Sequence, residues 1–432
     1  MTASLLGFAA LFALIFAGLP IAFAMIVVGF VGFAWMTDWG PALALIQQVT
    51  FDTGLSYELS VVPLFVLMGN FVARAGLSDE LYAAAHSWLG HRRGGLAMAT
   101  LTACAGFSAI CGSSLATAAT MAKVAMPSMR RYGYADSFAA GSIAAGGTLG
   151  ILIPPSVILV IYGIIAGQDI GLLFAAGLLP GLLGLACYIA AAAGVAAIDP
   201  RLGPPAERQS WPRRLRTLRG VWGVLVLFAL VMGGIYGGVF TPTEAGGVGA
   251  FGGFLFAVAR GRLGLAGLIE ILAESARTTA MLFFILIGAL TFSNFVNLAG
   301  LPAALAAWVG QIDAPALVVV AGMLGLYLVL GMVLESLSMV LLTVPVFYPL
   351  VQALGYDLIW FGVVVVVVTE ISLITPPIGL NVFVLRGVLP DVAAATIFRG
   401  LVPCIGADIV RLALIVLFPG ISLALPRLLS GS

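Results

Sequence analysis

The stretch GYADSFAAGSIAAGGTLGILIPP at residues 133–155 decides the fold, because the chain repeats its pattern as GYDLIWFGVVVVVVTEISLITPP at residues 355–377. Both stretches run from Gly-Tyr to Pro-Pro with the same spacing between the two pairs. A proline precedes each Gly-Tyr at the same separation, Pro127 in one half and Pro349 in the other. Duplicated halves whose apolar helices are interrupted by Pro and Gly at matching positions indicate a secondary transporter with its site near the membrane midplane.

The composition excludes an ordinary soluble protein. Hydrophobic residues make up 62% of the 432 residues and charged residues only 9%, and the mean hydropathy is +1.17. Soluble domains have about 45–50% apolar and about 25% charged residues. We therefore predict an all-α polytopic membrane protein. The sequence has no nucleotide fingerprint, phosphate loop or nucleophile elbow, so we expect neither an enzyme nor an ATP-driven pump, and we expect no nucleic-acid partner.

Arginine orients the chain in the membrane. The 19 basic residues are 18 Arg and one Lys. Basic residues concentrate on the cytoplasmic side of a membrane protein, and one arrangement of spans places all the main arginine groups there. This arrangement predicts that the N-terminus and the C-terminus are both periplasmic. The main groups are Arg92-Arg93, Arg130-Arg131, six arginines between residues 201 and 219, Arg260 with Arg262, and the single residues Arg277, Arg386 and Arg399.

We predict two repeats of inverted topology, residues 1–198 and 221–432, joined by a basic cytoplasmic linker at residues 199–220. Each repeat should contain about five transmembrane spans, an interfacial arm helix, a re-entrant helical hairpin and a helix broken at its Pro-Pro. An odd number of spans in the first repeat inverts the second. The predicted arms are residues 78–89 and 301–313, the hairpins about 94–131 and 314–356, the broken helices about 135–166 and 358–386, and the other spans of the first repeat 5–17, 20–36, 61–74 and 172–197.

Both hairpin tips carry polar residues at a depth where a bilayer disfavours them. Polar, irregular backbone at membrane depth is tolerated where it is packed in protein or lines a cavity. We therefore expect the tips to face the two broken helices. The tip residues are Ser108, Cys111, Gly112, Ser113, Ser114 and Thr117 in the first hairpin, and Glu335, Ser336 and Ser338 in the second.

The double prolines predict ligands for a cation. Proline has no N–H, so each Pro-Pro leaves carbonyls about one turn upstream without helical partners. Freed carbonyls beside Ser and Thr hydroxyls suit a small cation such as Na+, while the N-termini of half-helices favour an anion. An alternative is that these segments only kink the helices and let them pack closely. The presence of a hairpin and a break in each half favours a site.

Few acidic residues fall near the midplane. We expect only Glu335 and Glu370 there, and an intramembrane carboxylate indicates function. Glu335, at a tip, is the better candidate for a cation ligand, whereas Glu370 is either a hydrogen-bonded carboxyl or a protonation site. Glu244, in the sequence Thr-Pro-Thr-Glu, should instead close a helix capping box. Asp408 and Arg411 lie within the last apolar stretch and leave the limits of the last span open.

Several motifs together resemble the large membrane (permease, M) subunit of tripartite ATP-independent periplasmic (TRAP) transporters, DctM-like, over essentially the whole chain. The resemblance implies an elevator-type, sodium-coupled importer of small organic anions in the bacterial inner membrane, such as C4-dicarboxylates, sialic acid or related carboxylates. It also implies two partners, a periplasmic substrate-binding protein and a small four-helix membrane (Q) subunit. The motifs are residues 63–70, 112–117, 146–155, 162–163, 177–181 and 375–381.

The resemblance also implies roles for individual residues. One Na+ site would use Ser108, Cys111, Gly150, Ile153 and Pro155, and a second Glu335, Ser338, Ser372 and Thr375. The substrate would contact Ser113, Ser114, Thr117, Ser336 and Asn381, with Pro154, Pro376, Pro377 and Gly112 in structural roles.

Three positions depart from the commoner pattern of that family. Cys111 stands where Ser is usual, Glu335 where Asp is usual, and Ser372 where Gly is usual. The longer Glu335 side chain changes the expected Na+ geometry and leaves H+ open as the coupling ion. The alternatives are therefore a proton-coupled organic acid transporter, and a stand-alone anion/sodium symporter of the same plan that needs no binding protein. A lipid-modifying enzyme would want a polar triad or metal cluster, and a passive channel would want one continuous polar helix face; neither pattern is present.

Overall fold

The computed structural model describes residues 2–311 and 314–431, which form 21 α-helices and two short 3-10 helices and include no β-strand. The all-α prediction is therefore confirmed for this part of the chain. The first half comprises α1 (Thr2–Phe16), α2 (Ile21–Met36), α3 (Trp39–Leu55), η1 (Glu58–Ser60), α4 (Val61–Arg74), α5 (Leu77–Leu89), α6 (Gly95–Cys111), α7 (Ser114–Arg131), α8 (Asp136–Thr148), η2 (Leu149–Ile151), α9 (Val157–Ala166) and α10 (Ile170–Ile198).

A linker helix precedes the helices of the second half. The predicted arm at residues 301–313 corresponds to α15, and its last two residues lie outside the described residues. The helices are α11 (Trp211–Gly220), α12 (Trp222–Tyr236), α13 (Pro242–Ala259), α14 (Leu265–Leu298), α15 (Leu301–Gln311), α16 (Ala316–Gly331), α17 (Ser336–Ala353), α18 (Leu358–Ile374), α19 (Leu380–Val388), α20 (Ala394–Leu417) and α21 (Gly420–Ser430).

The duplication found in the sequence recurs in the structure. Helix α17 has the same length as α7, 18 residues, and each ends shortly before the Gly-Tyr pair of its half. The peptide bonds Pro154–Pro155 and Pro376–Pro377 are both cis. Gly133 and Gly355 both have positive φ, 77° and 79°, which a residue with a side chain adopts only with strain. Equivalent sequence patterns therefore produce equivalent local structures in the two halves.

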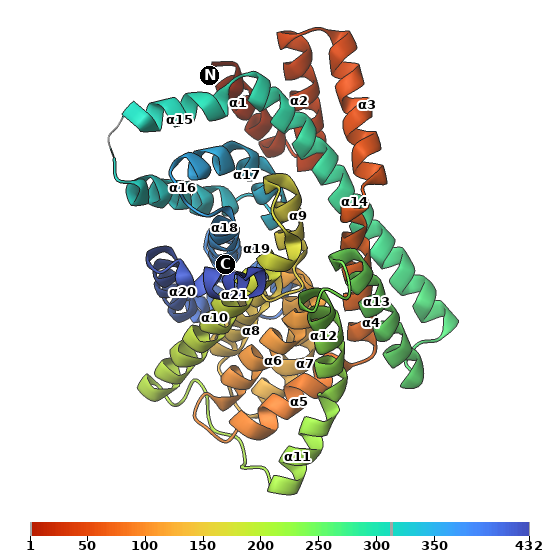
Figure 1. Cartoon of the computed structure of the whole chain (residues 1–432). Coiled ribbons are helices and arrows are strands. Elements are labelled where there is room, and N and C mark those ends of the chain that lie inside the picture. The colour runs from red at the N-terminus through yellow and green to blue at the C-terminus, as the bar shows by residue number, and fades with distance from the viewer. Residues whose placement is uncertain (1, 312–313, 432) are drawn as a thin grey trace.

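Helices from the two halves pack against one another in matched pairs. Helix α2 packs along α14, and its counterpart α13 packs along α4. The arm helices α5 and α15 lie at opposite ends of the molecule (Figure 1). At the centre, α8, α10, α18 and α20 form a bundle in which the valines of α18 are completely buried. A helix that is apolar all round, such as α18, is stable only when it is surrounded in this way.

One helix of the first half was not among the predicted spans. Residues 39–55 form α3, which is bent by 58° from the helical segment that continues as α4. Asp38 caps α3 by accepting a hydrogen bond from the Trp39 N–H at 2.7 Å. Gln47, Gln48 and Asp52 interrupt the apolar pattern of α3, which is why hydropathy alone does not mark a span there. The corresponding part of the second half is the single 34-residue helix α14.

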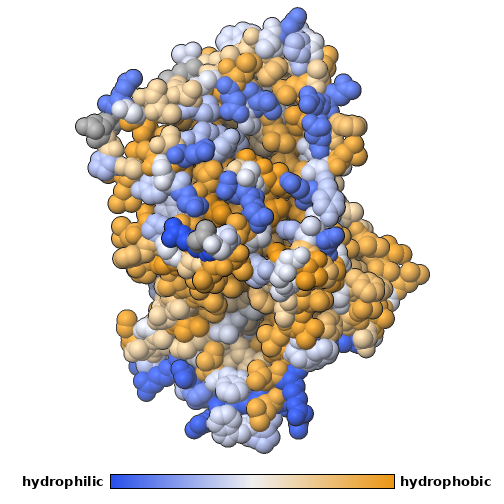
Figure 2. Space-filling view, in the orientation of Figure 1, coloured by the Kyte–Doolittle hydropathy of each residue, from blue (hydrophilic) through white to orange (hydrophobic). Residues whose placement is uncertain are grey.

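The surface matches the composition. Four of the described helices are each long and apolar enough to cross a membrane, and six spans result if each bent helix pair counts as one. Apolar residues cover the flank formed by α13 and α14, and hydrophilic residues gather at the end that carries α5 and α11 (Figures 1 and 2). At that end the basic residues pair with the arm: Arg260 bonds Glu80 at 2.9 Å, and Arg262 lies 3.7 Å from Asp79.

Candidate functional site

The first hairpin tip is a tight turn between α6 and α7. Gly112 ends α6 with a φ of 64°, in the left-handed region that favours glycine. Ser113 then caps α7, because its hydroxyl accepts a hydrogen bond from the Ala116 N–H. The positive end of α7 is therefore at the tip.

This tip lies directly against the break between α8 and α9. A Cβ atom on Gly112 would lie 2.8 Å from the Pro155 carbonyl oxygen, and one on Gly150 would lie 2.9 Å from the Thr117 hydroxyl. Glycine alone leaves room for these approaches. Residues of the predicted first cation set, Cys111 beside Gly112 on the tip and Gly150 with Pro155 at the break, are thus brought into one region.

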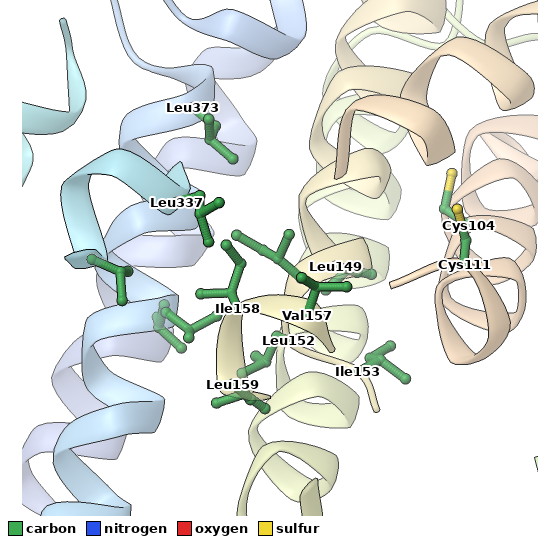
Figure 3. Packing of buried hydrophobic residues seen from close by; sticks show 14 of the residues in the cluster. Cys104, Cys111, Leu149, Leu152, Ile153, Val157, Ile158, Leu159, Leu337 and Leu373 are labelled. Atoms are coloured by element: carbon green, nitrogen blue, oxygen red, sulfur yellow. The ribbon is translucent and has the colours of Figure 1, made fainter. Parts of the chain in front are cut away.

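The other two members of that set point elsewhere. The Ser108 hydroxyl donates to the Cys104 carbonyl within α6, at 2.7 Å. The Ile153 side chain packs against Gly181 of α10. Ile153 would therefore contribute only its backbone carbonyl to a cation site, whereas the Ser108 hydroxyl oxygen keeps its lone pairs after it donates its proton. Figure 3 shows the apolar packing at the break, where Leu149, Leu152 and Ile153 lie near the start of α9.

The break is closed on one side by a residue that the sequence argument did not single out. Ser156 caps α9 by accepting a hydrogen bond from the Leu159 N–H at 3.2 Å, and its hydroxyl donates to the Ile151 carbonyl. Pro155 would otherwise leave that carbonyl without a partner. A serine directly after Pro-Pro and before an apolar run is the N-cap pattern that would have identified it.

The second tip and the second break are also in contact. Gly331, at the end of α16, packs against the Ser372 side chain of α18 so closely that a Cβ atom would clash with it. Within the break, the Ser372 hydroxyl donates to the Thr369 carbonyl at 2.7 Å and the Thr375 hydroxyl to the Ile371 carbonyl at 2.6 Å. At the start of α17, the Ser338 hydroxyl donates to the Glu335 carboxylate at 3.4 Å. Tip and break therefore supply one carboxylate and three hydroxyl oxygens.

A cavity of about 300 Å³ opens between the two tips. This volume lies at the lower end of the range for small-molecule sites, about 300–1,000 Å³. The cavity brings together Ser113 and Ser114 of the first tip with Glu335 and Ser336 of the second. Its lining residues are Val66, Gly69, Asn70, Cys111, Gly112, Ser113, Ser114, Leu115, Ala116, Ile151, Val157, Ile158, Glu274, Thr278, Met281, Leu282, Glu335, Ser336 and Leu337.

Two residues predicted to contact substrate are not in the cavity wall. The Thr117 hydroxyl donates to the Ser113 carbonyl at 2.8 Å and so supports the tip from behind. Asn381 is completely buried on α19, and its amide donates to the Ala144 carbonyl at 3.2 Å. In this structure the two side chains hold the tip and the break, while Ser113, Ser114 and Ser336 line the cavity. The substrate contacts of Thr117 and Asn381 stay predictions.

The opposite wall comes from two helices whose residues were not predicted. Asn70 on α4 and Glu274 on α14 line it, and the Asn70 amide donates to the Ser275 hydroxyl at 2.8 Å. Helix α4 approaches the first tip closely, since a Cβ atom on Gly69 would lie 3.2 Å from the Cys111 carbonyl oxygen. Among the described lining residues there are two carboxylates, Glu274 and Glu335, and no Lys or Arg.

The expectation that Glu335 and Glu370 are the only acidic residues near the midplane is wrong. Glu274 lines the cavity, and Asp408 is buried beside Glu370, where both contact Arg411. These partners come from α18 and α20, so their proximity cannot be read from the sequence. Glu244 behaves as predicted: the Thr241 N–H donates to its carboxylate at 2.9 Å, which completes the capping box of α13.

Comparison with known proteins gives relatives that share this architecture. Residues 8–421 match the family described as "Tripartite ATP-independent periplasmic transporter, DctM component". The C4-dicarboxylate TRAP transporter large permease protein DctM of Pseudomonas aeruginosa is 37% identical over 388 residues, covering 88% of this chain and 89% of that protein. The sialic acid TRAP transporter large permease protein SiaM of Vibrio cholerae is 36% identical, covering 97% of each.

The structure of the YdaH transporter of Alcanivorax borkumensis resembles this one with a TM-score of 0.64, at 16% identity and covering 89% of this chain and 90% of that one. At this level of identity the likeness concerns the fold alone. The likeness covers both halves of the chain.

Proposed function

The chain belongs to the family of the DctM component of tripartite ATP-independent periplasmic transporters, and from this premise we propose that it imports small organic anions by symport with Na+. As a member, it is the large permease subunit of a secondary transporter, a multi-pass protein of the inner membrane and not an enzyme. The observation that carries the proposal is the cavity between the two hairpin tips, which joins serine hydroxyls, a carboxylate and the N-terminus of α7.

The oxygens at the two breaks are suitable ligands for Na+. Pro154 has no N–H to donate to the Gly150 carbonyl, and Pro376 has none to donate to the Ser372 carbonyl. The Gly150 carbonyl is therefore released from regular helical pairing beside the first tip. The Ser372 carbonyl accepts one bond, from the Thr375 N–H at 3.3 Å, and has a second lone pair for a cation. The first site would use the carbonyls of Gly150, Ile153 and Pro155 with Ser108 and Cys111, and the second would use Glu335, Ser338, Ser372 and Thr375. When bound there, Na+ would supply positive charge beside a cavity that contains two carboxylates and no basic side chain among its described lining residues.

The substrate class follows from the same charges. A bound organic anion needs positive potential, which the N-terminus of α7 and the bound Na+ would provide together. Binding of one would then favour binding of the other. The relatives named above transport C4-dicarboxylates or sialic acid according to their names. We propose a carboxylate of similar size, between Ser113, Ser114 and Ser336.

The transport movement we propose is an elevator. The hairpins α6–α7 and α16–α17 and the broken helices would move as one unit against a scaffold that includes α2, α4, α13 and α14. The cavity supports this division, because its two walls belong to these two groups of helices. The opposite positions of α5 and α15 support two repeats of inverted topology (Figure 1). We propose that the N-terminus and the C-terminus are both periplasmic, because this arrangement places the main arginine groups in the cytoplasm. A periplasmic binding protein would deliver the substrate, and a small four-helix membrane subunit would complete the complex.

The test is uptake of labelled organic acids into proteoliposomes that contain the full chain with its small subunit and binding protein. We expect uptake to require all three proteins and Na+. Glu335→Gln should lower uptake at limiting Na+ about tenfold or more, because a charged cation ligand is lost, and Glu335→Asp should retain much of it. Glu244→Gln is the matched control, since Glu244 is an exposed capping residue.

Uptake by this chain alone would contradict the tripartite assignment and favour a stand-alone symporter. Equal uptake by Glu335→Gln and wild type would contradict the role of Glu335.

A further inference from the structure

A chain of five buried polar side chains crosses the central bundle away from the cavity. It consists of Thr148 on α8, Tyr188 on α10, Glu370 on α18, and Asp408 and Arg411 on α20, and each residue is 0% exposed. None of them lines the cavity between the tips. Burying two carboxylates and a guanidinium costs free energy unless they are paired. A buried charged group of this kind therefore indicates a functional role.

The contacts in this chain are continuous. Arg411 forms an ion pair with Glu370, and its Nη2 lies 2.9 Å from the Asp408 Oδ1. The Tyr188 hydroxyl donates to the Asp408 Oδ2 at 2.5 Å. Thr148 completes the chain, with its hydroxyl 3.0 Å from that of Tyr188. The four helices of the central bundle are thereby linked through side chains.

The two ends of the chain lie at the two helix breaks. Thr148 is the last residue of α8, and Gly150 follows it by two positions. Glu370 precedes Ser372 by two positions on α18. Each end therefore adjoins an oxygen that we assigned to a different cation site, although the two breaks belong to different halves of the sequence.

The Thr148 hydroxyl has two acceptors within reach. Tyr188 has one hydroxyl proton, and Asp408 accepts it. The single Thr148 proton then has two acceptors, the Ala145 carbonyl at 2.7 Å and the Tyr188 oxygen at 3.0 Å. The first bond closes the last turn of α8, and the second holds Thr148 towards α10. An element with two discrete arrangements that both sites bias is the physical requirement for coupling between them.

We propose that Glu370, Arg411, Asp408, Tyr188 and Thr148 form a positioning network through which occupation of one cation site favours occupation of the other. The inference rests on the proposed function, since it needs both Na+ sites. Tyr188 and Thr148 touch neither cation nor substrate and act through the geometry of the breaks. Coupling between sites is commonly about 5-fold to 150-fold in affinity.

The test is the Na+ dependence of uptake by the complete transporter in proteoliposomes. The wild type should show a sigmoidal curve with a Hill coefficient above 1. Tyr188→Phe keeps the ring packed against Arg411 but removes the link to Thr148. It should lower the coefficient to that of two independent sites that must both be filled, and raise the half-saturating Na+ concentration about 5-fold or more. Thr148→Val removes the same hydrogen bond from its other end and should give the same result. This second variant provides the test if Tyr188→Phe fails to reach the membrane.

Tyr327→Phe is the control, because it also removes a buried tyrosine hydroxyl bond, but one between Tyr327 and Thr343 within a single hairpin. It should leave the Hill coefficient unchanged. If the effect of Tyr188→Phe came only from a general loss of packing, Tyr327→Phe would lower the coefficient too. A wild-type curve without cooperativity, or wild-type cooperativity in both Tyr188→Phe and Thr148→Val, would overturn the network while leaving Na+ coupling intact. Uptake that does not depend on Na+ in the wild type would instead overturn the proposed function.

Discussion

Four acidic side chains near the centre of the molecule have two different environments. Glu335 and Glu274 face the cavity, where a cation or substrate can reach them. Glu370 and Asp408 are completely buried and are held by Arg411. The sequence identified Glu335 because it lies at a predicted hairpin tip. It left the role of Glu370 open, because the partner that decides it lies 41 residues away on another helix.

Gly150 offers a test of the contact between the first tip and its break. In Gly150→Ala the new Cβ would lie 2.9 Å from the Thr117 hydroxyl and close to the Ser113 carbonyl, so the tip must shift. We expect a loss of uptake of about tenfold or more, measured at equal amounts of protein in the membrane, because small displacements of binding groups are costly.

The matched control is Gly194→Ala, near the C-terminal end of α10, where nothing lies within 4 Å of a new Cβ. It should be neutral for uptake and should stabilise the protein by up to about 1 kcal/mol, because alanine favours a helix. Normal uptake by Gly150→Ala would show that the tip and the break do not need this close approach.

At the scale of elements, local sequence patterns predicted where helices lie but not which helices pack against one another. The arm, the first hairpin and the broken helix of the first half coincide with α5, α6–α7 and α8–α9, because Pro, Gly and arginine pairs mark their ends. Helix α3 was not predicted as a span because Gln47, Gln48 and Asp52 interrupt its apolar pattern. The cavity wall from α4 and α14 was missed because it depends on how two helices from different halves of the chain pack together.

The arm helix α5 should respond to pH through His86. Burial, and then the positive charge of Arg213, lower the pKa of His86 below its ordinary value. The unfolded chain therefore binds the proton near pH 6.5 while the folded protein does not, so stability falls as the pH drops below about 6.5. His86→Phe, which keeps the packing against Tyr82 and Tyr132, should reduce this loss.

The measurement is the thermal unfolding temperature in detergent at pH 7.5 and pH 5.5. The wild type should lose more stability between these two values than His86→Phe. An equal decrease in both proteins would assign the pH dependence to other groups.

At the scale of the whole molecule, two equivalent halves meet at one cavity. Each half contributes a hairpin tip to its wall, and the first half also contributes its broken helix. The helices α2, α4, α13 and α14 join the halves in matched pairs. The duplication itself was visible in the sequence, because the Gly-Tyr and Pro-Pro pairs recur with the same spacing in each half. How the halves meet depends on packing between distant segments, and only the structure supplies it.

The most direct test of this account is the accumulation of a labelled organic acid in proteoliposomes under an imposed Na+ gradient, with the small subunit and binding protein present. We predict accumulation above the external concentration when Na+ is higher outside. This accumulation should disappear when Na+ is equal on both sides, while a pH gradient alone should drive none. Accumulation driven by the pH gradient without Na+ would contradict sodium coupling and would assign the carboxylate of Glu335 to proton transport.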